Sequence, residues 1–263
     1  MSAGLAGKAR GAARSVLAAR ARDVTAEVAR RSCVVVAPHP DDETFGCAAT
    51  MARKAAAGTR VLVVVVSDGS ASHRTTVITP VELAGVRRAE AMQAVARLHP
   101  AIEVRFLDFP DGDLASHSGE ITERLAELLT FESPDEIYAP DLREPPADHA
   151  VVAAAVRRAR ARQATPAVLL EYPIWLWSTW PWTPGASAAQ RLAQPLPAIL
   201  RGHPVRVATG EFLPAKRRAI QAYATQVTQF RADPTWSPLP AEFIKRFVGR
   251  YELFFPVGTD PAR

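Results

Sequence analysis

The stretch CVVVAPHPDDETFG, residues 33–46, decides the fold of this chain. Its first five residues, 33–37, are apolar and mostly β-branched, which is typical of a strand buried on both faces of a sheet. Pro38 and Pro40 stiffen the turn that follows, and a helix is expected at about 43–58. The polar side chains of the turn therefore come directly after the carboxyl end of a buried strand. Open α/β sheets bind their ligands at this edge.

The alternation of buried strand and helix continues along the chain. Apolar runs predict further strands at residues 60–67, 103–107, 136–139 and 167–171. Helices are expected at about 43–58, 80–98, 119–132 and 148–163. Because strand–helix–strand units build parallel sheets, the prediction is an α/β fold with a Rossmann-like, mostly parallel sheet and helices on both faces.

The composition changes after about residue 140. Sixteen of the 22 prolines and all five tryptophans lie from Pro140 onward, and four of the tryptophans fall between Trp175 and Trp182. An irregular region is expected at 173–204, with helices after it at about 213–228 and 239–248. No clean domain boundary is visible, so residues 32–263 are predicted to form one domain with the Pro- and Trp-rich part packed on the core.

The net charge of +5 comes from a basic leader, residues 1–31. The leader holds seven basic and two acidic residues, so the rest of the chain is electrically balanced. A helix rich in alanine and arginine is expected there, either solvated or in weak contact with an anionic lipid surface. Nucleic-acid binding would rest on this leader alone, and the balanced body is not typical of it. No nucleic-acid partner is predicted.

The overall composition excludes several classes of protein. Hydrophobic residues make up 48% and charged residues 22%, which excludes wholesale disorder. No apolar run approaches the roughly 20 residues of a membrane span, and the leader lacks the apolar core of a secretory signal. The two cysteines cannot build a disulfide framework, and Cys47 is expected to be a small buried side chain. We expect a cytoplasmic protein of undetermined oligomeric state.

The turn after the first strand carries the predicted chemistry. The adjacent carboxylates Asp41 and Asp42 repel each other, and burying them together is costly unless a cation neutralises them. The alternative is a solvent-exposed turn in which an aspartate caps the helix. Placement after a buried strand favours a metal held by His39 and Asp42, with Asp41 free to act as a base. His149 is the best third ligand, because it follows another predicted strand and opens a helix.

Two nitrogens, one carboxylate and an open position make a catalytic zinc arrangement. The other histidines have simpler roles. His99 ends a predicted helix, His117 starts one and His203 lies in a proline-rich loop, so each is expected to be a surface or capping residue.

The decapeptide PHPDDETFGC, residues 38–47, resembles the signature of the PIG-L/LmbE-like family of zinc-dependent N-deacetylases. Other stretches are similar to family motifs: Ser67-Asp68-Gly69, the helix 83–90 with Arg87 and Glu90, Pro110-Asp111-Gly112, Asp148-His149, Glu171-Tyr172-Pro173 with the tryptophans after it, and Lys216 to Gln226. Together they cover most of residues 33–255. The resemblance implies a hydrolase that removes an acyl group, acetyl above all, from an N-acylated amino sugar or glycoconjugate.

The resemblance also implies roles for individual residues. It implies one Zn²⁺ ion per chain, or another divalent metal, with His39, Asp42 and His149 as ligands. It implies Asp41 as the general base. One position departs from the family pattern, because Pro146 stands where the HPDH motif has its first histidine. That histidine is thought to stabilise the oxyanion or protonate the leaving amine, and proline offers no donor for either task.

Two consequences of Pro146 stay open. Either another group takes over, with His73, Arg74 and Arg143 as candidates, or the chain is a catalytically weakened, zinc-containing sugar-binding protein. The residues expected to bind substrate are His73, Arg74, Asp111, Arg143 and Trp175. Trp175 could stack on a sugar ring, although core packing is the alternative for the tryptophan cluster. Arg87 and Glu90, three positions apart on a helix, are expected to pair with each other.

Overall fold

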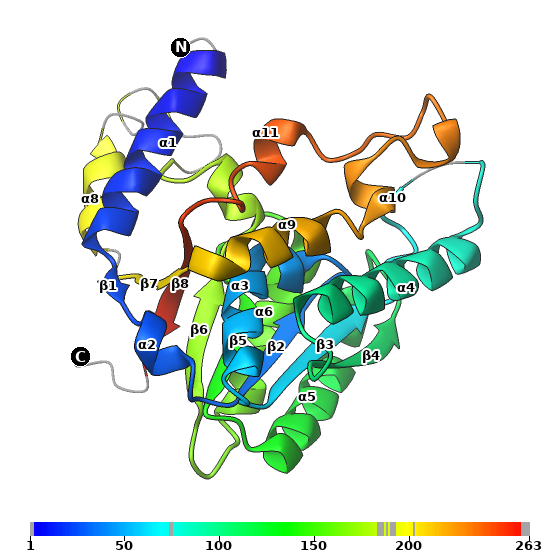
Figure 1. The fold of residues 1–263 in the computed structure, drawn as a ribbon, viewed down its shortest axis with the longest axis horizontal. Coiled ribbons are helices and arrows are strands. Elements are labelled where there is room, and N and C mark those ends of the chain that lie inside the picture. Colours follow the sequence, from blue (N-terminus) through cyan, green and yellow to red (C-terminus); the bar gives the residue numbers. More distant parts are fainter. Residues whose placement is uncertain are drawn as a thin grey trace.

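The computed structural model describes residues 3–73, 76–182, 187, 189, 193–201 and 203–258. One eight-stranded sheet runs through the molecule in the order β1-β7-β8-β6-β5-β2-β3-β4 (Figure 1). The strands are β1 Arg22–Asp23, β2 Cys33–Ala37, β3 Val61–Ser67, β4 Glu103–Phe109, β5 Glu136–Pro140, β6 Val168–Tyr172, β7 Val205–Ala208 and β8 Tyr251–Val257.

The part of the sheet from β6 to β4 is parallel throughout. β8 runs antiparallel to both β6 and β7, and β7 pairs in parallel with the short β1. The Rossmann-like, mostly parallel sheet is confirmed, and the five predicted strands are present with ends within two residues. The sequence did not predict β1, β7 or β8.

Helices cover both faces of the sheet, as predicted. The longer ones are α1 Ala3–Arg20, α3 Asp42–Ala56, α4 Pro80–Leu98, α5 Ser118–Glu132, α6 Ala147–Arg160, α8 Pro195–Arg201 and α9 Leu213–Ile220. Alternate strand residues point to opposite faces. Val35 and Val63 pack with α3 and α4, whereas Val34 and Val64 pack with α5 and α6. In Figure 1, α9 lies across α3.

The C-terminal third is less regular than the sequence indicates. The helix expected at 213–228 is interrupted after Ile220 and resumes as the short α10, Ala224–Val227. The helix expected at 239–248 is reduced to α11, Ala241–Ile244. Part of the expected irregular region lies outside the described residues. Buried Trp177 and Trp180 belong to the main core, whereas Trp175 is 36% exposed.

The N-terminal leader contacts the rest of the chain. Leu17 of α1 is fully buried in the main core, and β1 extends the sheet beside β7. The buried ammonium of Lys54 donates to the carbonyls of Val28 and Arg31 and to Glu136 Oε2, over 2.6–2.7 Å. These bonds join α2, Thr25–Val28, and the following turn to α3 and β5. The division of the chain into a leader, 1–31, and a domain, 32–263, stays a prediction. No described helix is long and apolar enough to cross a membrane.

Gly46, in the first turns of α3, is required by a close approach of Tyr172. A Cβ at Gly46 would lie 2.6 Å from Tyr172 Cδ2, and the Tyr172 hydroxyl is fixed by donating to the Val36 carbonyl over 2.8 Å. We therefore expect Gly46→Ala to lower the free energy of unfolding by about 1–3 kcal/mol, the usual cost of overpacking.

The matched control for this substitution is Gly85→Ala. Gly85 lies within α4, and a Cβ there meets nothing within 4 Å. Alanine should therefore raise the free energy of unfolding at this position, by up to about 1 kcal/mol. Urea unfolding of both variants provides the measurement. Equal stability changes at the two positions would contradict this explanation of Gly46.

Candidate metal centre and its pocket

The candidate site lies at the carboxyl edge of the sheet, between β2 and β5. His39 belongs to the turn that follows β2, and Asp42 is the first residue of α3. His149 lies in the first turn of α6, after the loop that leaves β5. The carbonyl of Pro38 accepts from Ser67 N over 2.9 Å, which ties the turn to the end of β3.

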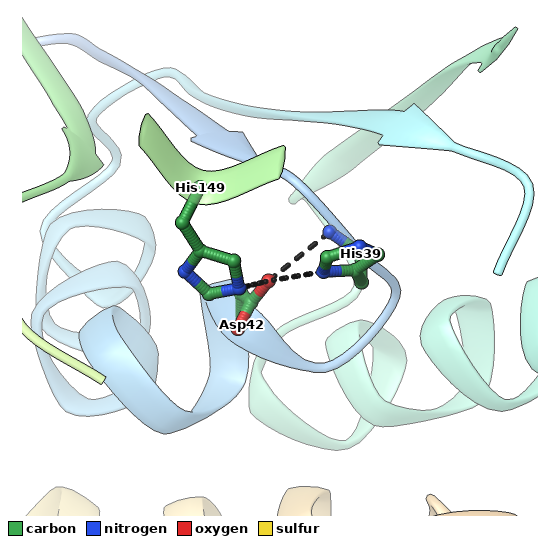
Figure 2. Close-up of side chains that lie close together, drawn as sticks. All are labelled: His39, Asp42 and His149. Atoms are coloured by element: carbon green, nitrogen blue, oxygen red, sulfur yellow. Dashed lines mark hydrogen bonds and ion pairs between the residues drawn. The ribbon is translucent and has the colours of Figure 1, made fainter. Parts of the chain in front are cut away.

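The three predicted metal ligands converge on one carboxylate oxygen (Figure 2). Asp42 Oδ2 lies 3.3 Å from His39 Nδ1 and 3.4 Å from His149 Nε2. The backbone N–H of His39 also donates to this oxygen, over 3.1 Å. One ligand atom from each of the three residues lies within 4.8 Å of the others. Asp42 and His149 are buried and His39 is half-buried, so the cluster is reached from one side.

These distances fit a tetrahedral zinc ion. Bonds of about 2.0–2.2 Å place neighbouring ligand atoms about 3.3–3.5 Å apart, close to the separations from Asp42 Oδ2 to the two imidazoles. The surrounding charge also favours a cation, because further carboxylates gather at the cluster: Asp41, Asp111, Glu144 and Asp148. The residues present therefore fit the metal that the sequence implies.

His39 is oriented by two carboxylates on its other side. Its Nε2 lies 3.1 Å from Asp111 Oδ1 and 3.3 Å from Asp148 Oδ2. A proton on Nε2 would be shared with these oxygens, leaving the Nδ1 lone pair directed at the cluster. Burial opposes protonation of His39, but Asp111, Asp148 and Asp42 raise its pKa well above the usual range. Asp111, expected to bind sugar hydroxyls, is thus engaged with His39.

Asp148 is held in place by the backbone. Its carboxylate accepts from Gly112 N over 2.8 Å and from Leu114 N over 3.3 Å. The Pro110-Asp111-Gly112 turn that follows β4 is thereby joined to the start of α6. This turn therefore supports His39 through both Asp111 and Asp148.

Asp41 is held in a strained backbone conformation beside the ligands. Its φ of 136° lies in a region that favours glycine, and such conformations cost about 1–3 kcal/mol and cluster at functional sites. Arg87 lies 3.3 Å from Asp41 Oδ2 and also donates to the Pro40 carbonyl. Burial raises the pKa of Asp41 well above its usual range, against the effect of Arg87, and the neighbouring Asp42 adds to the rise.

The ion pair expected between Arg87 and Glu90 is wrong. Arg87 reaches the turn after β2, as described for Asp41. Glu90 accepts instead from Thr225 N and Oγ1, over 2.8 and 2.6 Å. Helical spacing predicted a local pair, whereas both side chains point into the tertiary structure. Cys47 is a buried free cysteine, as predicted.

Glu144 is a residue of this site that sequence reasoning missed. Its buried carboxylate accepts from the backbone N–H groups of Ile174, Trp175 and Leu176, over 2.7–3.0 Å. Its Oε2 lies 3.4 Å from His149 Nδ1, an atom without a hydrogen-bond partner among the described residues. Glu144 thus stands behind His149 as a carboxylate that can orient the ring. An acidic residue shortly before a ligand histidine was the only signal in the sequence.

We expect Glu144→Gln to weaken zinc binding by about 10–100-fold, the usual effect of removing a carboxylate behind a ligand histidine. Competition with a chelator of known affinity measures this change. Glu123→Gln is the matched control, because Glu123 is exposed and pairs with Arg162 on another face. An unchanged zinc affinity in Glu144→Gln would exclude the orienting role.

A pocket of about 380 Å³ opens onto the cluster. Its lining includes His39, Asp41, Asp42 and His149 together with His73, Arg87, Asp111, Pro146 and Trp175. Three of the expected substrate-binding residues, His73, Asp111 and Trp175, therefore face the pocket. Arg143 does not line it: its guanidinium pairs with Asp141 and lies over the Phe255 ring. Arg74 lies outside the described residues.

A comparison with known protein families finds one model that matches the part of the chain holding this arrangement. Residues 34–160 match PIG-L, described as GlcNAc-PI de-N-acetylase. The matched residues include the strands from β2 to β5, the turn after β2 and all of α6, and thus every residue of the candidate metal centre. No curated protein sequence matches the chain significantly.

Solved structures share the fold beyond the PIG-L segment. The N,N'-diacetylchitobiose deacetylase from Pyrococcus horikoshii is 17% identical, with a TM-score of 0.63, over 88% of this chain and 87% of that one. The A40926 pseudoaglycone deacetylase Dbv21 is 19% identical, with a TM-score of 0.63, over 89% and 100%. GalB, the 4-carboxy-2-hydroxymuconate hydratase from Pseudomonas putida, is 18% identical, with a TM-score of 0.63, over 89% and 98%. At such identities the likeness establishes the fold alone.

Proposed function

We propose that this chain is a metal-dependent hydrolase that removes an acyl group, acetyl above all, from an N-acylated amino sugar or glycoconjugate. The observation that carries the proposal is the convergence of His39 and His149 on Asp42, with Asp41 beside them, at the base of a pocket. The PIG-L match and the deacetylases that share the fold support it. A cytoplasmic location and a small-molecule substrate belong to the same proposal.

His39, Asp42 and His149 would hold the metal. A zinc ion bound there supplies a Lewis acid for an amide carbonyl and lowers the pKa of a bound water toward about 7. Asp41 accepts the proton of the attacking water, since its carboxylate is buried, lines the pocket and has a raised pKa. Arg87 keeps the Asp41 carboxylate directed toward the cluster.

The leaving amine requires a proton, and Pro146 cannot supply it. His73 is the candidate that the pocket offers. Its ring stacks on Trp236 at 4.1 Å, and its nitrogens lie 3.2 Å from Ser72 Oγ and 3.3 Å from the Ser237 carbonyl. Burial and the charge of Arg87 lower the pKa of His73, against the effect of the hydrogen bond to the Ser237 carbonyl, so its protonated ring gives up a proton more readily than a free imidazolium. We assign to His73, in its protonated form, the proton that Nδ1 gives to the leaving amine, while Nε2–H keeps its bond to the Ser237 carbonyl.

The remaining wall of the pocket suits a sugar ring. Trp175 is partly exposed there, and its ring lies 4.6 Å from that of Phe243. Flat apolar faces beside polar groups such as Gln226 and Ser237 allow stacking on one side of a sugar and hydrogen bonds to its hydroxyls. Trp175 is therefore the substrate-stacking residue of the proposal.

The test is acetate release from a panel of N-acetylated amino sugars, disaccharides and glycoconjugates by the zinc-loaded protein. Release from at least one substrate supports the hydrolase. A zinc-loaded protein that binds such a sugar without releasing acetate would support the alternative of a sugar-binding protein, which Pro146 motivates. The hydratase among the structures of the same fold shows why the reaction itself must be measured.

A further inference from the structure

A second cavity, of about 510 Å³, lies between α1 and the chain that leads from α11 into β8 (Figure 1). It is separated from the metal pocket by an aromatic wall. Phe45 lines both cavities, and its ring lies 6.1 Å from Phe243 on the metal side and 5.1 Å from Phe247 on the second side. The cavity therefore does not belong to the site already described.

Its lining is strongly cationic. The basic side chains come from the leader helix, β7, α9 and the segment before β8: Arg14, Arg206, Lys216, Lys245, Arg246 and Arg250. Glu252 is the acidic residue of the lining. Its buried carboxylate already accepts from Lys216, from Ala49 N and from Thr50 N, over 2.7–2.8 Å. Glu252 is thus unable to neutralise the remaining bases.

Three of these bases have no carboxylate partner in the part of the chain that the structure describes. Arg206 pairs with Asp23 and Lys245 with Glu242. Among the described residues, no carboxylate lies within ion-pair distance of Arg14, Arg246 or Arg250. Arg246 donates to the neutral Ser178 Oγ over 2.7 Å, and the Arg14 guanidinium lies over the Trp177 ring at 5.7 Å.

The arginines also repel one another. Burial lowers the pKa of Arg14, and the charge of Arg246 lowers it further. Burial and the charge of Arg10 likewise lower the pKa of Arg246, against the weaker effect of Glu242. Half-buried like charges without a counter-ion are unfavourable, and an anion between them would remove both the repulsion and part of the desolvation cost. The cluster is therefore arranged to gain stability from a bound anion.

We propose that this cavity binds a compact polyanion of the phosphoryl or pyrophosphoryl class. Guanidinium groups match phosphate oxygens with paired hydrogen bonds, and Arg14 approaches the cavity from α1 whereas Arg246 and Arg250 approach it from the segment before β8. The volume lies in the usual range for a small-molecule site. The flat rings of Trp177 and Tyr251 line the same cavity and suit the organic part of such a ligand. The proposal is independent of the reaction at the metal centre.

The test is calorimetric titration of the full chain with pyrophosphate at low salt, with inorganic phosphate as a second probe. We expect wild type to bind pyrophosphate at one site. We expect Arg14→Ala/Arg246→Ala to raise Kd by about 10-fold or more, because each removes a charge-assisted hydrogen bond. Arg124→Ala, an exposed arginine of α5 on the opposite face of the sheet, is the control for charge loss and should leave Kd unchanged.

The melting temperature of the double variant without ligand shows whether the variant is folded. Relief of repulsion should keep the double variant as stable as wild type, and pyrophosphate should stabilise wild type but not the variant. If the double variant unfolds early, Arg250→Ala, which removes an exposed side chain, replaces it in the titration.

A lipid headgroup is the other source of the same chemistry. Co-sedimentation with vesicles of phosphatidylserine and phosphatidylcholine distinguishes binding of a lipid headgroup from binding of a soluble phosphate compound. Binding to the anionic vesicles without binding of soluble pyrophosphate would overturn the proposal. Equal pyrophosphate affinity of the double variant and the Arg124→Ala control would overturn it as well.

Discussion

Asp41→Asn should reduce acetate release by about 10²–10⁴-fold, the usual contribution of a positioned general base. Asparagine is nearly isosteric and tolerates positive φ better than most residues, so the backbone at φ 136° is preserved. The carbonyl of residue 41 still accepts from Thr44 N and Phe45 N at the start of α3. The variant therefore removes the base without removing the turn that positions the metal ligands.

Steady-state kinetics and zinc content, measured on the same preparation, distinguish a lost base from a lost site. Asp41→Asn should retain bound zinc. Asp113→Asn is the matched control, because Asp113 is exposed and bonds Ser116 at the surface. Undiminished acetate release by Asp41→Asn would remove Asp41 from the mechanism.

His149→Ala should abolish zinc binding under conditions where wild type retains the metal. Three protein ligands hold the ion in the proposed site, so loss of one should exceed the roughly 10–100-fold penalty of losing an orienting partner. Hydrolysis should fall with the metal. The side chain is 1% exposed and lies against Asp42 and Glu144, so its loss also leaves a space in the protein.

The second variant, His149→Gln, fills that space and controls for a packing defect. His203→Ala is the control for histidine number, since His203 is exposed and remote from the cluster. Metal analysis of folded, purified protein gives the result directly. One zinc per chain in both His149 variants would show that the residue is not a ligand.

The strands of the parallel half of the sheet could be predicted because their signal is local. A continuous apolar run rich in β-branched residues, such as 61–66, indicates a strand that is buried on both faces. The strands β7 and β8 carry no such run. β8 contains Pro256 and alternates half-buried with buried residues over 251–255, where it pairs antiparallel with β6 and β7. Their existence depends on pairing between segments far apart in sequence.

The convergence of His39, Asp42 and His149 could be predicted because strand ends share one edge of a parallel sheet. The residues that support them could not. Arg87 reaches Asp41 from α4, and Glu144 combines a contact to His149 with three backbone contacts after β6. Arg87 and Glu144 each contact a residue on another element. A sequence pattern does not predict how these elements are placed relative to one another. Arg143 illustrates the opposite error, since its position near His149 in sequence does not bring it to the pocket.

Pro146 remains the feature that separates this chain from the family pattern. It lines the pocket beside His149, at the position where the family pattern has a histidine. His73, fixed by Trp236, lies in the same lining and comes from a different loop. Because His73 and Pro146 line the same pocket, we propose that His73 performs the role of the histidine that Pro146 replaces.

The most direct test of the central claim is removal and restoration of the metal. The purified protein is stripped with a chelator, its zinc content is measured, and acetate release from the best N-acetylated substrate is followed as zinc is returned. The account predicts that release stops in the stripped protein and recovers in proportion to zinc, reaching its maximum at one ion per chain. Acetate release that persists at full rate in protein free of metal would contradict the assignment of His39, Asp42 and His149 as the centre of the reaction.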